Sequence, residues 1–147
     1  MAQGDSFIFY DFELKRGQGN YNLGTDGFSI AFVADTFASL NQSATNPNIS
    51  GFTPLSGGNF AASTNLGSLT WGRTGSVSTF DYANLATILK DAANPTTIRV
   101  ALIKHTTSGD LYKAVDLTTD GSTAIDVVNN DFDYTVSASG SMTTTVV

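Results

Sequence analysis

The chain of 147 residues has no cysteine and a single histidine. The absence of cysteine excludes disulfides, thiolate nucleophiles and cysteine metal sites, and one histidine alone argues against a zinc site. The first residues contain no basic region followed by a long apolar run, so we expect no secretory signal. No run approaches the roughly 18 apolar residues of a membrane helix. We therefore expect no membrane partner.

Charged residues are also scarce. They make up 14% of the chain, where about 25% is usual, and the net charge is −6. An acidic chain without a basic stripe does not favour nucleic acid as a partner. Serine, threonine, glycine and asparagine are abundant instead. Such a surface fits a partner that covers much of it, but β-rich domains also favour threonine, so composition leaves both interpretations open.

What the sequence does contain is a series of short apolar segments separated by turn residues. Residues 28–35 and 96–106 predict buried strands, and Ser108-Gly109-Asp110 predicts a hairpin turn into a strand at 111–119. Further strands are expected at 6–13, 59–64, 67–73, 76–82, 120–128, 131–139 and 142–147. About nine short strands predict an all-β sandwich or barrel, in one domain spanning 1–147.

Two segments depart from the strand pattern. Residues 36–50 form a long polar connection, with one helical turn expected near Phe37–Leu40. Connections of this length are uncommon unless they have a function. The one predicted helix lies within 81–95, where Leu85, Ile88 and Leu89 have helical spacing and Pro95 ends the segment.

Two glycine-rich stretches raise the question of phosphate binding. Gly67 and Gly72 have the spacing of a P-loop and precede Arg73-Thr74, but a P-loop must lead from a strand into a helix, and a strand-like segment follows here. In residues 51–60, Pro54 and Gly57-Gly58 predict a bend with positive φ whose ends are anchored in the core by Phe52 and Phe60. We expect no cofactor.

His105 is predicted at a strand end beside Ser108. A Ser-His-Asp arrangement can be drawn, but nothing resembles a nucleophile elbow, so a surface histidine is the favoured interpretation. Aspartates gather in the last third of the chain and could offer oxygens to calcium, although no EF-hand-like loop is present and Asp120-Gly121 better fits a turn. We expect no catalytic residue and no metal. A hydrolase remains an alternative, and it would require a cleft with convergent carboxylates such as Asp116 and Asp133.

Trp71 has two interpretations. Together with Phe52, Phe80 and Tyr82 it could form a platform on which a sugar stacks. Aromatic residues at strand positions more often belong to the core, which favours the second interpretation.

The order of segments resembles that of the decoration, or cement, proteins of tailed-bacteriophage capsids. The similar segments are "LGTDGFSIAFVAD" (23–35), the Gly51-Phe52 and Gly57-Gly58 positions, "IRVALIK" (98–104), and the end of the chain from "DLYKAVDL" to "SMTTTVV". The resemblance covers about 22–147.

The resemblance implies a jelly-roll-like β-sandwich without enzymatic activity. It also implies a homodimer or homotrimer that binds the major capsid protein on the outer surface of the virion, after synthesis in the host bacterial cytoplasm. Intersubunit contacts are expected from the N-terminal segment 1–22 and the C-terminal strand 142–147, and the loop 36–50 is a further expected contact. The expected interface residues are Phe7, Phe9, Tyr10, Phe12, Leu14, Phe37, Leu40, Met142, Val146 and Val147. A glycan-binding adhesion module of a head or tail fibre is the alternative.

Overall fold

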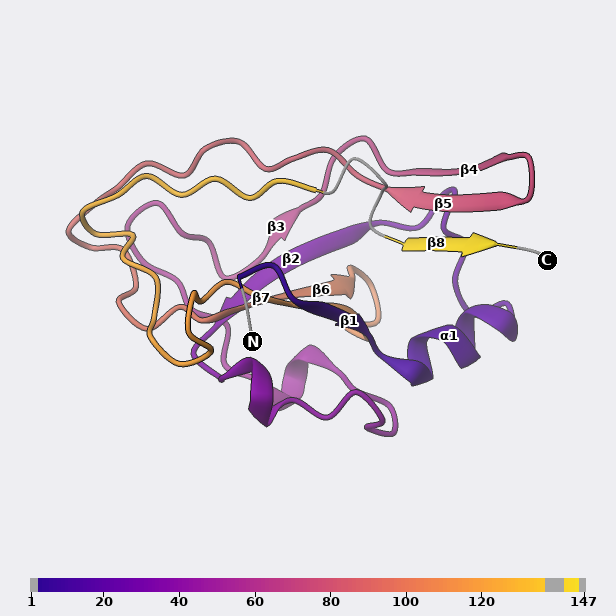
Figure 1. Cartoon of the computed structure of the whole chain (residues 1–147), viewed down its shortest axis with the longest axis horizontal. Coiled ribbons are helices and arrows are strands. Elements are labelled where there is room, and N and C mark those ends of the chain that lie inside the picture. The colour runs from indigo at the N-terminus through magenta and orange to yellow at the C-terminus, as the bar shows by residue number, and fades with distance from the viewer. Residues whose placement is uncertain (1–2, 137–141, 146–147) are drawn as a thin grey trace.

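The computed structural model describes residues 3–136 and 142–145, which form two antiparallel sheets with one α-helix beside them (Figure 1). The strands are β1 (Ser6–Ile8), β2 (Phe28–Val33), β3 (Thr64–Asn65), β4 (Thr70–Thr74), β5 (Val77–Asp81), β6 (Val100–His105), β7 (Leu111–Asp116) and β8 (Met142–Thr145). The helix is α1 (Tyr10–Gly17), and the 3-10 turns are η1 (Phe37–Ser39) and η2 (Ile49–Gly51).

The larger sheet has the strand order β1-β7-β6-β2-β3 and is built on its three central strands. All six residues of β2 are buried, which explains why every residue except Ser29 is apolar and the segment does not alternate. Register pairs such as Ile30 with Ile103 and Ala101 with Val115 align β2, β6 and β7. The strands predicted at 28–35, 96–106 and 111–119 are confirmed in shorter form as β2, β6 and β7, as is the hairpin that joins the last two.

The smaller sheet, of order β4-β5-β8, packs on the larger one through aromatic side chains. Phe80 of β5 lies 5.1 Å from the ring of Phe28 and 5.5 Å from that of Tyr112, and all three are buried. These contacts join the two layers into one apolar core. The predicted all-β, sandwich-like class with one short helix is confirmed, and the finer jelly-roll path stays a prediction.

The strand predicted at 6–13 is wrong beyond its first three residues. Only Ser6–Ile8 is a strand, and α1 begins at Tyr10. The helix has acidic Asp11 and Glu13 in its first turn and basic Lys15 and Arg16 in its last. This charge order complements the helix dipole, and it outweighs the strand preference of the preceding aromatic residues.

The predicted helix within 81–95 is also wrong. Asp81 ends β5, and the segment after it runs in an extended form beside residues 132–134. The Leu85 N–H donates to the Tyr134 carbonyl (3.2 Å), while Ile88 and Phe132 exchange both of their backbone bonds. A helix of two to three turns is only marginally stable without packing. The backbone hydrogen bonds to residues 132–134 therefore favour the extended conformation of this segment.

The strands predicted at 120–128 and 131–139 are not formed by their described residues, which make turns and the bridge to Ile88. Asp120 and Asp126 accept hydrogen bonds from backbone N–H groups two and three residues later. Aspartate favours such turns over a ladder. The strand predicted at 59–64 shrinks to Thr64–Asn65, whereas those at 67–73, 76–82 and 142–147 appear as β4, β5 and β8.

The bend in residues 51–60 has the predicted form. Gly57 and Gly58 both have positive φ, of 146° and 53°. A Cβ at Gly58 would lie 2.9 Å from the backbone nitrogen of Asn94. Phe60 is buried and Phe52 is half-buried against the core, so the segment is a structural bend packed against Ala93-Asn94.

Candidate functional site

The residues expected at an interface separate into core and surface residues. Phe9 and Phe12 are buried, and Phe12 stacks on Tyr21 with ring centroids 4.7 Å apart. Tyr10 and Leu14 lie one turn apart on the other side of α1 and are 59% and 58% exposed. Of this helix, only Tyr10 and Leu14 offer apolar surface to a partner.

The expected contacts beyond α1 are mostly occupied within the chain. Phe7 and Phe37 contact each other with ring centroids 5.1 Å apart, Phe37 is buried, and Leu40 is half-buried. Met142 belongs to β8, whose backbone pairs with β5 of the same chain. Val146 and Val147 lie outside the described residues.

The exposed side of α1 adjoins the loop 36–50. Tyr10, Asp11 and Leu14 line a shallow cavity of about 310 Å³ with residues 43–45 of that loop. The Tyr10 N–H donates to the Gln42 carbonyl (3.2 Å), and the Gln42 amide donates back to the Ile8 carbonyl (2.9 Å). We call Tyr10, Leu14, Ser43, Ala44 and Thr45 the α1–loop surface.

A network around Asp110 holds α1 against the β6–β7 hairpin. The Asp110 carboxylate accepts from Tyr21 (2.5 Å), Lys15 (3.2 Å) and Asn48 (3.1 Å). Burial acts to raise the pKa of Asp110, but these hydrogen bonds outweigh it and hold the pKa below the ordinary value. Burial, with the hydrogen bond and charge of Asp110, raises the pKa of Tyr21. The pair is thus fixed as a neutral phenol donating to a carboxylate.

His105 ends β6 as predicted, and it joins two residues in the order of a Ser-His-Asp relay. Ser108 Oγ lies 2.9 Å from His105 Nδ1, and His105 Nε2 lies 3.4 Å from Asp26 Oδ2. The Ser108 N–H also donates to Nδ1 (3.2 Å), and Ser108 Oγ accepts from the Asp110 N–H (3.2 Å).

This arrangement serves the hairpin turn better than it serves catalysis. A serine nucleophile needs donors aimed at the oxyanion of its substrate, and the serine's own N–H is used on the histidine here. Ser108 is exposed on the turn and lines none of the five cavities described in this section. The imidazole is mostly covered, and it contacts the rings of Tyr21 and Phe28.

The carboxylates proposed for a hydrolase do not form an exposed pair. Asp116 is fully buried, and its Oδ1 accepts from the Thr118 N–H and hydroxyl. Asp133 accepts from the Thr87 hydroxyl at the surface (2.6 Å). Within residues 3–136 and 142–145, no group of three or more acidic or histidine side chains is placed to hold a metal ion. The exposed Asp120 carboxylate instead accepts from the Thr123 hydroxyl and from the Thr123 and Ser122 N–H groups, which lowers its pKa.

Trp71 is not a core residue, contrary to the favoured interpretation. It is 37% exposed on β4, whereas Phe80 and Tyr82 are buried. Its ring lies 5.7 Å from the Arg16 guanidinium carbon, in the range of a cation–π contact. Arg16, Tyr21, Asn22 and Trp71 line a cavity of about 380 Å³. The sequence offered no signal for this, because Arg16 and Trp71 are far apart along the chain.

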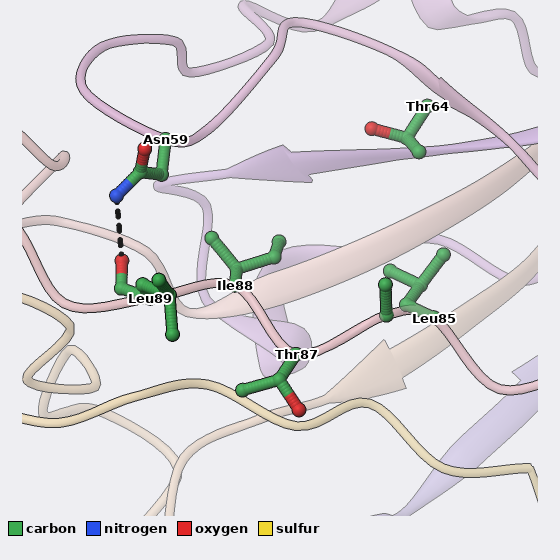
Figure 2. A pocket seen from close by; sticks show the side chains of 7 residues that line it. Asn59, Thr64, Leu85, Thr87, Ile88 and Leu89 are labelled. Atoms are coloured by element: carbon green, nitrogen blue, oxygen red, sulfur yellow. Dashed lines mark hydrogen bonds between the residues drawn. The ribbon is translucent and has the colours of Figure 1, made fainter.

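Three further cavities lie on the surface of the described residues. One, of about 340 Å³, lies along residues 85–89, where Leu89 is 60% exposed and its carbonyl accepts from the Asn59 amide (3.0 Å; Figure 2). Another, of about 300 Å³, is lined by Lys113 and Tyr134, and burial lowers the pKa of Lys113 and raises that of Tyr134. The last, of about 320 Å³, lies beside Leu40.

No family model, curated protein or solved structure matches the chain. Among the described residues, no helix has the length and apolar character needed to cross a membrane.

Proposed function

We propose that this protein is a non-enzymatic structural protein of a phage virion, which decorates the outer capsid surface and stabilises it by bridging major capsid proteins. The observation that carries the proposal is the α1–loop surface. It brings together α1 and the loop 36–50, two segments from which contacts are expected, and it exposes Tyr10 and Leu14 there.

Two properties of the chain support a surface covered by neighbours. A partner that removes exposed tyrosine and leucine side chains from water stabilises the complex by about 25 cal/mol per Å² of apolar area buried. Only 14% of the residues are charged, so few ions must be desolvated. In this proposal the chain also binds copies of itself, and it acts on the virion after synthesis in the host cytoplasm.

The test is binding to expanded capsids assembled from the major capsid protein of the genome that encodes this chain. We expect Tyr10→Asp and Leu14→Asp to weaken binding at least tenfold, because each places a charge in an apolar contact. Leu89→Asp is the matched control, since Leu89 is equally exposed on another face. A wild-type protein with no affinity for such capsids would refute the proposal.

The exposure of Trp71 favours a second candidate, a glycan-binding adhesion module. Trp71 presents part of an aromatic ring beside Arg16 and Asn22, and an aromatic side chain with adjacent hydrogen-bonding groups suits the mixed apolar and polar surface of a sugar. A glycan-array signal that disappears in Trp71→Ala, but persists in Leu89→Ala, would support this candidate. The absence of any signal for the wild type would dismiss it.

A further inference from the structure

Strand β4 forms an open edge of the smaller sheet. It pairs with β5 on one side, and all five of its residues are exposed. An edge strand presents unpaired N–H and C=O groups, and proteins usually protect such edges with charged residues, especially lysine, or with proline, a bulge or a covering segment. Thr70–Thr74 contains no proline and one charged residue, Arg73. Its register with β5 runs without a shift, and no strand of the described residues covers its outer side.

The turn of the β4–β5 hairpin determines which groups face outward. Gly75, at the first of the two turn positions, has φ of 60°, and Thr74 pairs with Val77 across the turn. In a two-residue hairpin the pair that flanks the turn is hydrogen-bonded, and hydrogen-bonded and non-hydrogen-bonded pairs then alternate. Gly72 therefore bonds toward β5, whereas the N–H and C=O of Trp71 and Arg73 point away from it.

We propose that β4 pairs antiparallel with β4 of a second copy of this chain, around a two-fold axis at Gly72. This register places Trp71 opposite Arg73 of the second copy at both ends of the pair, and four backbone hydrogen bonds form from groups that already face outward. The two smaller sheets then become one continuous sheet across the dimer.

The side chains of β4 are complementary in this register. Arg73 is the only charged residue of the strand, so no like charges lie opposite each other, and each arginine meets a tryptophan, the ring that favours cation–π contacts most. Thr70 lies opposite Thr74, a favourable cross-strand pair. At the axis, where backbones in a non-hydrogen-bonded pair approach to about 4.5 Å, two glycines meet without side chains.

The expectation that this chain binds copies of itself comes from the proposed function, and this inference rests on it. The inference adds that β4 is the strand through which two copies pair. The test is the mass of the full-length protein in solution, by sedimentation over a wide range of concentrations, for the wild type and two variants at one position. Arg73→Pro removes an outward N–H but no hydrogen bond to β5. Arg73→Ala keeps that N–H and loses only the side chain.

We expect a two-chain mass for the wild type, dissociation at least tenfold easier for Arg73→Pro, and a change of only a few-fold for Arg73→Ala. In the wild type, amide exchange at Trp71 and Arg73 should slow as concentration rises, which tests the pairing even if the proline variant does not fold. A monomeric wild type, a three-chain mass, or unchanged exchange at these two amides would overturn the inference.

Capsid binding separates this inference from the proposed function. If a monomeric Arg73→Pro variant still binds capsids, the pairing and the decoration role both stand and are independent. If the wild type dimerises through β4 but has no affinity for capsids, the pairing stands and the proposed function fails.

Discussion

Gly58 occupies a position that tolerates no side chain. Its φ is 53°, and an added Cβ would lie 2.9 Å from the Asn94 nitrogen. We expect Gly58→Ala to lower the free energy of unfolding by about 1–3 kcal/mol from the strained backbone conformation alone. The clash of the new Cβ with Asn94 adds to this loss. Urea unfolding measures the change. Gly51→Ala is the control, because Gly51 has no positive φ and no atom within 4 Å of an added Cβ. Equal stability of the two variants would contradict the packing described for this bend.

We also expect the hydrogen bond from Tyr21 to Asp110 to contribute to the free energy of unfolding. Tyr21→Phe removes one hydrogen bond to a charged group, a change of about 1.5–3 kcal/mol. We expect the lower end of that range, because Lys15 and Asn48 still donate to Asp110. Tyr10→Phe makes the same chemical change on an exposed residue and should have little effect. Urea unfolding of the two variants at neutral pH makes the comparison, and a similar loss in both would contradict a specific role for Tyr21.

The same pair has a predictable pH dependence. The folded-state pKa of Asp110 is below its ordinary value of 3.8, so its contribution is fully present above that value. The contribution is lost as pH falls from about 3.8 through the folded pKa. In Tyr21→Phe the folded pKa moves back toward the ordinary value, and the acid-induced loss should become smaller. Unfolding free energies measured between neutral and acidic pH test this, and an identical acid slope in both proteins would count against it.

At the scale of elements, α1 shows how one helix can combine a core side and a partner side. Phe12 packs on Tyr21, Tyr112 and Phe28, whereas Leu14 is largely exposed. We expect Phe12→Ala to lower the free energy of unfolding by about 3–5 kcal/mol, and Leu14→Ala to change it by no more than about 0.5 kcal/mol. Urea midpoints for both variants make the comparison. A large loss of stability in Leu14→Ala would mean that this residue is part of the fold rather than free for a partner.

The elements also show what sequence patterns can predict here. Residues 28–33, 100–105 and 111–116 were predictable because buried central strands need mostly apolar residues, and the turn at Ser108-Gly109 marks the hairpin between the last two. The helical spacing of Leu85, Ile88 and Leu89 led to the wrong prediction of a helix. Residues 132–134 supply backbone hydrogen-bond partners to this segment, and no local sequence pattern reveals them. Helix α1 was predictable in principle from its charge order, which the aromatic pattern of residues 6–13 obscured.

The candidate site was less predictable than the fold. Tyr10 and Leu14 were among the expected interface residues, but the sequence did not separate them from Phe9 and Phe12. That separation depends on which side of α1 meets Tyr112, a contact with a residue about 100 positions away. The proximity of Arg16 to Trp71 and of Asp26 to His105 likewise arises only from the fold.

For the whole molecule, the small number of charges predicts how its proposed partner binding responds to salt. Salt weakens the attraction between exposed charges, with a screening length of about 10 Å at 0.1 M salt. Apolar contacts are not screened in this way. Because the α1–loop surface is mainly apolar and hydroxyl-bearing, we expect affinity for capsids to change only a few-fold between low and high salt. Co-sedimentation with capsids across salt concentrations measures this. A steep fall in affinity with salt would show that ion pairs dominate the contact and that another surface is responsible.

The pairing of β1 with β7 has a consequence for how the chain folds during its synthesis. Ser6 pairs with Val115, so the first strand is made about 110 residues before its partner, a delay of roughly 5–20 s at ordinary translation rates. Strand β2 likewise waits for its partner β6, which is made about 70 residues later. The larger sheet therefore closes only after β7 has been synthesised, and until then the aromatic side chains of β1, α1 and β2 leave the ribosome unburied and accessible to a chaperone.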